Sequence, residues 1–178
     1  MEIRTRPSSS EKGDDGISDL LRCVETFDTE QLTRSLVRDW KRMSPLDFLN
    51  SRIVPLSQAV GGGWAAAGLE IRHERFLSER VGDLLRSVRL PLEEKAHGPL
   101  IVCASLPGEE HSLGLQMVAL LLTEARCRVL FLGTEVPPTQ VASLTRDLNA
   151  RAVAIRGRSQ HGSQRCPRRI SPRSPRCR

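Results

Sequence analysis

The hydrophobic pattern of the 178-residue chain changes its period once, and this change constrains the fold more than any other feature. Before residue 91, apolar residues recur at the three- and four-residue spacing of amphipathic helices. After residue 99, short apolar runs alternate with helical stretches, as they do in parallel sheets with crossover helices. The sequence therefore predicts a four-helix cap domain at 17–90, a linker at 91–99 and a partial α/β domain at 100–155.

The first half is predicted to contain four amphipathic stretches with short connections, which is typical of a helix bundle. They cover Ile17–Val24, Glu30–Met43, Pro45–Val60 and Leu77–Val88. Asp28 precedes the second stretch as an N-cap, and Ser44 with Pro45 begins the third. Pro55 should kink the third helix, and the fourth should end before Pro91.

The second half has the order strand, helix, strand, helix, strand. Strands are predicted at Leu100–Ala104, Arg128–Leu132 and Ala152–Ile155, with helices at Leu113–Ala125 and Thr139–Leu148. This order predicts an incomplete Rossmann-like (flavodoxin-like) parallel sheet, and the whole chain is classed as α plus α/β. Because ligands of such sheets bind beyond the carboxyl ends of the strands, we expect the site in the loops after these strands.

The two ends of the chain differ in composition from its middle. Residues 1–16 are polar and are predicted to be a flexible lead-in. Residues 156–178 contain eight arginines, no Lys, Asp or Glu, and a single large aliphatic residue, Ile170. We expect a disordered Arg/Pro/Ser-rich tail that cannot extend the sheet. The abrupt change indicates a truncated or frameshifted chain, with an evolved basic tail as the alternative.

Charge and length exclude several classes of protein. Before the tail, 19 basic residues are balanced by 21 acidic ones, so DNA binding is expected only nonspecifically, through the tail. No apolar run is long enough for a membrane span and residues 1–15 lack a signal-peptide core, which predicts a cytoplasmic protein without a membrane partner. The five cysteines lack metal-binding spacing, and no hydrolase or Walker motif occurs, so no catalytic residue is predicted.

The loop after the first predicted strand carries a carboxylate-x-His-x-x-Gly pattern, formed by Glu109, His111 and Gly114. Taken alone, this pattern also fits a solvated histidine near a helix N-terminus. In its place before a helix, it resembles the cobalt-ligand loop of cobalamin-binding domains, which usually have Asp at position 109. The resemblance implies that His111 coordinates cobalt and that Glu109 hydrogen-bonds its other ring nitrogen. It also implies a cofactor pocket lined by Ser112, Leu113, Gly114 and Gly133.

A second pattern lies in the helical half, where Trp64 is followed after nine residues by Glu74 and Arg75. It resembles the cap of light- and cobalamin-responsive regulators, in which Trp, nine residues and Glu-His cover the upper face of the corrin. The resemblance implies that Trp64, Glu74 and Arg75 contact the cofactor, with Arg75 in place of histidine. The patterns do not distinguish between the adenosyl, methyl and hydroxo forms of cobalamin. Bundle core is the alternative for Trp64, and His73 is interpreted as a surface residue.

Together these resemblances, over residues 17–155, predict a cobalamin-binding sensory or regulatory protein. We expect it to be light- or cofactor-responsive and to control transcription through a transcription-factor partner or self-association, because residues 1–16 are too short for a helix-turn-helix. A corrinoid carrier of a methyltransferase system is the first alternative, and a haem-binding redox or light sensor is the second. Arg156 stands where the family has the Ser-x-Leu that holds the nucleotide arm, so weak or absent cobalamin binding is predicted.

Overall fold

A computed structural model describes residues 11–62, 69–109 and 111–157, with the backbone alone at 11–15. Its helical half contains α1 (Glu11–Glu25), α2 (Thr29–Trp40), α3 (Pro45–Phe48), the π-helical turn η1 (Leu49–Ile53), α4 (Val54–Gly62) and α5 (Ile71–Glu93). Its second half contains β1 (Leu100–Ser105), α6 (Leu113–Glu124), β2 (Arg128–Gly133), α7 (Pro138–Asp147) and β3 (Ala152–Arg156). The predicted fold class, a helical region followed by a Rossmann-like parallel sheet, is confirmed.

Both predicted helix caps are present. The carboxylate of Asp28 accepts a hydrogen bond of 2.9 Å from the backbone N–H of Gln31, at the start of α2. The hydroxyl of Ser44 accepts one of 3.1 Å from the N–H of Asp47, at the start of α3. These side chains satisfy N–H groups that the first turn of a helix leaves without a partner.

Three helix features differ from the prediction or refine it. α1 begins at Glu11 rather than Ile17, since extending a formed helix costs far less than starting one. α5 continues through Pro91 to Glu93, so the predicted end before Pro91 is wrong; a proline in the last turn removes only one helical hydrogen bond. The expected irregularity at Pro55 takes the form of η1, a widened turn that ends at Ile53, two residues before the proline.

The interpretation of His73 as a surface residue is wrong. Only 5% of this residue is exposed, and its Nδ1 accepts a hydrogen bond of 2.8 Å from the backbone N–H of Glu70. Its ring stacks on Phe27 with centroids 4.7 Å apart. In the first turn of α5, His73 serves as a cap, which helical periodicity alone does not reveal.

The described sheet has the order β2-β1-β3, and both strand pairs are parallel. Because β2 and β3 flank β1 on opposite sides, the crossover direction changes at β1. Open α/β sheets bind ligands at such a point, beyond the carboxyl ends of the strands. The ends of β1 and β3, at Ser105 and Arg156, are paired there.

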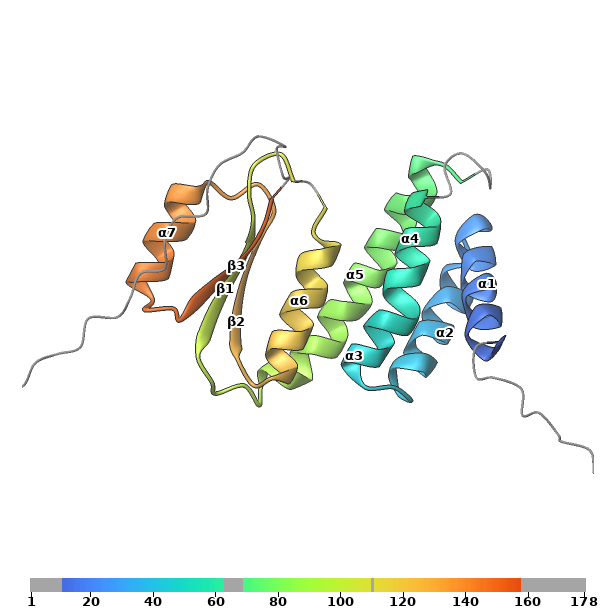
Figure 1. The fold of residues 1–178 in the computed structure, drawn as a ribbon, viewed down its shortest axis with the longest axis horizontal. Coiled ribbons are helices and arrows are strands. Elements are labelled where there is room, and N and C mark those ends of the chain that lie inside the picture. The colour runs from blue at the N-terminus through green and yellow to red at the C-terminus, as the bar shows by residue number, and fades with distance from the viewer. Residues whose placement is uncertain (1–10, 63–68, 110, 158–178) are drawn as a thin grey trace, which may run out of the picture.

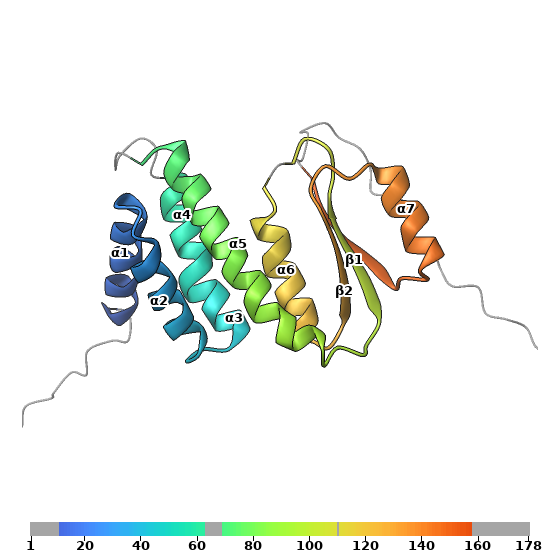
Figure 2. The ribbon, with the colours of Figure 1, turned by 180° about the vertical axis from the view of Figure 1, so that it is seen from behind.

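Helix α6 joins the two halves. Its Leu120 lies in the core of the helical half, whereas Leu115 and Ala119 pack with Ile101 and Cys103 on the sheet. The opposite face of the sheet is covered by α7. Figures 1 and 2 show the resulting order of layers, from α7 through the sheet and α6 to α5 and the other helices. Within the described ranges, no helix has the length and apolar character needed to cross a bilayer.

The position of Leu120 predicts how strongly the two halves depend on each other. Leu120 is fully buried, so Leu120→Ala should lower the free energy of unfolding by about 2–5 kcal/mol, through lost burial and a residual cavity. Val118 on the same helix is 42% exposed, and Val118→Ala should change it by less than about 1 kcal/mol. Urea unfolding followed by circular dichroism measures both, and equal effects would contradict this account of α6.

Candidate functional site

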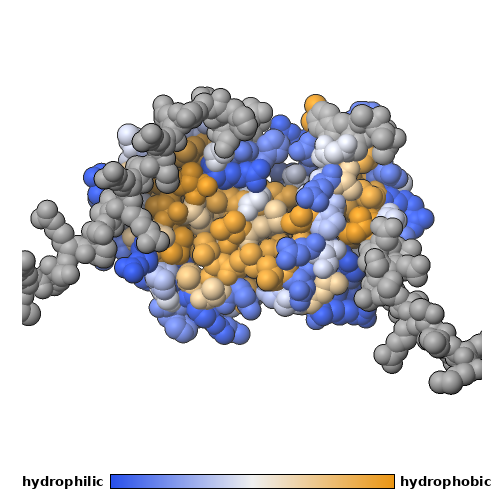
Figure 3. All heavy atoms as spheres, in the orientation of Figure 1, coloured by the Kyte–Doolittle hydropathy of each residue, from blue (hydrophilic) through white to orange (hydrophobic). Residues whose placement is uncertain are grey.

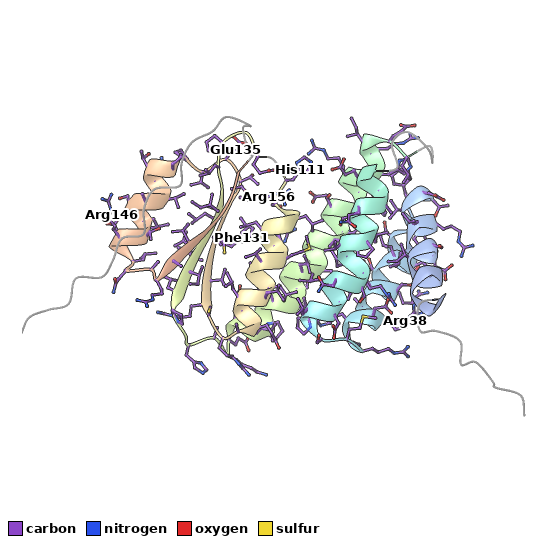
Figure 4. The ribbon with its side chains drawn as sticks, in the orientation of Figure 1. Arg38, His111, Phe131, Glu135, Arg146 and Arg156 are labelled. Carbon is purple, nitrogen blue, oxygen red and sulfur yellow. The ribbon has the colours of Figure 1, made fainter. Side chains whose placement is uncertain are left out.

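His111 lies in the loop between β1 and α6, at the carboxyl edge of the sheet and opposite α5 (Figure 4). Its Nδ1 is 3.4 Å from Oε1 of Glu109. Its Nε2 is 3.4 Å from Oε1 of Glu74, a residue of α5. The imidazole is therefore placed between a carboxylate of its own loop and one from the helical half.

Glu109 contacts both the backbone of this loop and the end of β3. It is 7% exposed, and its Oε1 accepts a hydrogen bond of 3.1 Å from the backbone N–H of His111. Its Oε2 is 3.3 Å from Nε of Arg156, at the end of β3. Burial raises the pKa of Glu109, but the His111 N–H and the Arg156 guanidinium stabilise the charged form and together hold the pKa below its usual value. Glu109 is thus a carboxylate at neutral pH.

An open cleft of about 320 Å³ lies beside His111, between the two halves of the molecule; we call it the His111 cleft. Ser57, Glu74 and Leu77 line it from α4 and α5. His111, Leu113, Gly114 and Arg156 line it from the α/β half. The hydroxyl of Ser57 is buried and has no hydrogen-bond partner among the described residues. The volume of the His111 cleft is at the low end for ligand pockets. A ligand larger than this volume requires the two halves to separate.

The loop that carries His111 is tied to the loop after β2. The carboxylate of Glu135 accepts a hydrogen bond of 3.0 Å from the backbone N–H of Gly108, which has a φ of +87°. The N–H of Val136 donates to the carbonyl of Ser105. Glu135 itself has a φ of +60°, a conformation that costs a side-chain-bearing residue energy. These two hydrogen bonds connect the loop after β2 to the loop that carries His111.

The structure brings together most of the predicted site residues. Glu74, His111, Leu113 and Gly114 line the His111 cleft, and Glu109 lies directly below His111. Arg75 and Ser112 line a smaller adjoining hollow with Glu74 and His111. Gly133 ends β2, has a φ of +90° and does not line the cleft. Trp64 lies outside the described residues.

Two residues of this site, Arg156 and Glu135, were not predicted from the sequence. Arg156 pairs with Glu109, although the sequence suggested only that it replaces a family motif. Glu135 positions the His111 loop from the next strand. Arg156 is the last residue of β3 and Glu135 lies two residues after β2. The rule that ligands bind at the carboxyl ends of parallel strands was therefore the signal that could have found them.

Comparison with known proteins now adds to this geometry. Residues 99–170 match the B12 binding domain. The match implies cobalamin as the cofactor of this half and extends past β3 to residue 170. None of the curated proteins matches the chain. The fold is similar to the structure of the monomethylamine corrinoid protein of Methanosarcina barkeri, with a TM-score of 0.64 and 14% identity over 82% of this chain and 69% of that chain.

The tie between the loops can be tested at Glu135. Glu135→Ala removes the bond to Gly108 and should lower the free energy of unfolding by about 1 kcal/mol. Glu135→Gly loses the same bond but relieves the positive φ, so it should be more stable than the alanine variant by about 1 kcal/mol. Glu135→Gln keeps an acceptor and is the matched control. Urea unfolding measures all three, and an alanine variant as stable as wild type would contradict the proposed tie.

Proposed function

We propose that this chain is a corrinoid carrier, in which His111 would hold the cobalt of a cobalamin placed between the helical half and the sheet. The observation that carries the proposal is the orientation of His111. Its Nδ1 faces Glu109, and its Nε2 faces the cleft. A ligating imidazole needs this arrangement, because a carboxylate on one nitrogen fixes the tautomer and raises the basicity of the other.

The residues of the cleft fit such a group. His111 is the imidazole among the residues that line the cleft, and it would hold the cobalt. Gly114 lines the cleft beside His111, and the Arg156 side chain fills the space that its missing side chain leaves. Ser57 lines the cleft from α4, and its buried hydroxyl has no partner among the described residues. When bound, the cofactor supplies a cobalt that can accept a methyl group and pass it on, while the protein supplies binding and orientation.

Glu74 has a separate part in this proposal. Two ligands of one metal ion lie about 3.3 Å apart, so the 3.4 Å between Nε2 of His111 and Glu74 would admit a bare ion. It leaves no room for a corrin ring between the two side chains. α5 must therefore move away from the His111 loop before a ligand is coordinated. Glu74, which faces His111 across the cleft, would then be available to contact the bound group from the helical half.

A sensory regulator remains the second candidate. Glu74 belongs to the Trp64-to-Glu74 pattern that resembles cobalamin-responsive regulators, and the structure places it opposite His111. The described geometry is the same for both functions. We place the carrier first because the similar fold belongs to a corrinoid protein named for monomethylamine, whereas neither match names a regulator.

Spectroscopy of the full chain tests ligation by His111. Hydroxocobalamin is added in the dark, the protein is desalted, and the visible spectrum of the retained pigment is recorded. Wild type and His111→Ala should differ in the cobalt-dependent bands and by at least about tenfold in affinity, since a first ligand is lost. His97→Ala removes an exposed histidine outside the cleft and should behave as wild type.

Identical spectra of wild type and His111→Ala would overturn ligation by His111. A haem Soret band without cobalt would favour the haem-sensor alternative. Carrier and sensor are separated by a second experiment on the loaded protein. Methyl iodide labels any reduced corrinoid and releases iodide, so the measured quantity is the onward transfer of the label. A carrier should pass the labelled methyl group to a thiol acceptor in the presence of a partner methyltransferase, whereas a sensor should keep it and change its oligomeric state or partner binding on illumination.

A further inference from the structure

Two cavities of the α/β half meet at one pair of residues. The first is the His111 cleft. The second, of about 390 Å³, is an open groove between β3 and α6, which we call the β3–α6 groove. Gly114 and Arg156 line both cavities. They therefore form the partition between the cleft and the groove.

The Arg156 side chain closes this partition. A Cβ atom placed on Gly114 would lie 1.9 Å from Nη1 and 3.2 Å from Cζ of Arg156, so the guanidinium occupies the hollow that the glycine leaves. It is held there by Glu109, 3.3 Å away. The guanidinium and the carboxylate thus fill the point where the two cavities would otherwise join.

The closure is built from a side chain that can leave. The backbone of Arg156 is fixed, because its carbonyl accepts a hydrogen bond of 2.9 Å from the N–H of Leu106. Its side chain, however, is 42% exposed. The guanidinium can therefore turn toward water, and when it does the buried carboxylate of Glu109 keeps the hydrogen bond from the His111 N–H.

The groove beyond the partition is apolar. It is lined by Leu115 and Val118 of α6 and by Ala154 and Ile155 of β3. Val118 is 42% exposed and Ile155 54% exposed. Figure 3 shows hydrophobic surface over the area of α6 and β3. Such a surface can pack against a flat, weakly polar group, but its apolar side chains offer no hydrogen bonds or charges to a compact ion.

We propose that Arg156 is a gate that determines which corrinoids this chain accepts. The inference rests on the proposed function, with His111 as ligand. When His111 takes the cobalt, the cofactor's own base is displaced, and the arm that carries it needs space outside the cleft. The β3–α6 groove adjoins the cleft, and Arg156 closes the way into it. A corrinoid with a nucleotide arm therefore has to displace Arg156, whereas one without the arm does not.

The test compares hydroxocobalamin with cobinamide, which lacks the nucleotide arm. Dissociation constants are measured by equilibrium dialysis with absorbance for wild type, Arg156→Ser and Arg151→Ser. Arg151 is an exposed arginine at the other end of β3 and lines neither cavity. Losing the contact with Glu109 acts on both corrinoids alike, so the gate is read from the ratio of the two dissociation constants. Arg156→Ser should shift this ratio about threefold to tenfold in favour of cobalamin. Arg151→Ser should leave both unchanged.

The outcomes distinguish the gate from its alternatives. Weaker cobalamin binding by Arg156→Ser, with cobinamide unchanged, would overturn the gate and make Arg156 an anchor for the phosphate of the arm. Equal changes for both corrinoids would also overturn it. If none of the variants binds either corrinoid, the proposed function fails and the gate fails with it. Urea unfolding of each variant confirms that the compared proteins are folded.

Discussion

The packing of α6 between the sheet and the helical half is the constraint on which the site depends. Leu120 belongs to the core of the helical half, while Leu115 and Ala119 belong to the core against the sheet. The loop before α6 carries His111, so fixing both faces of this helix also fixes the distance from His111 to Glu74 on α5. The site is a product of interdomain packing as much as of its own loop.

The electrostatics of the site follow from the parallel sheet. β1 delivers Glu109 and β3 delivers Arg156 to the same edge, because parallel strands end on the same side. Glu109 is buried yet remains charged, since a backbone N–H and a guanidinium offset its desolvation. That charge orients the imidazole of His111. The same arginine lies between the His111 cleft and the β3–α6 groove, so one ion pair both supports the His111 loop and separates the two cavities.

Periodicity and capping chemistry were enough to predict the elements of the fold. The predicted strand over 128–132 matches β2 to within one residue, and Asp28 and Ser44 cap the helices that they precede. The failures at His73 and Pro91 have a common cause. Each lies in a terminal turn of α5, where hydrogen bonding departs from the regular helical pattern. The spacing of apolar residues therefore does not predict there which side chains are exposed or where the helix ends.

The site was only partly accessible to the same reasoning. The motif put Glu109 and His111 next to each other, because their contact is local in sequence. The contacts of His111 with Glu74, and of Glu109 with Arg156, span tens of residues and depend on how two halves pack. No sequence spacing encodes such a contact. It appears only when the carboxyl ends of the strands and the face of α5 are placed in space.

The length of α5 has a mechanical consequence. Near its end, Arg89 lies over the ring of Phe131 on β2, with Cζ 5.2 Å from the centroid, which anchors the helix to the sheet. Glu74 lies fifteen residues earlier on the same rigid helix, about 22 Å away at 1.5 Å per residue. A tilt of about 10° around the anchor would move Glu74 by about 4 Å. Because Glu74 lies far from this anchor, it is a part of α5 that any change in the tilt of the helix displaces strongly.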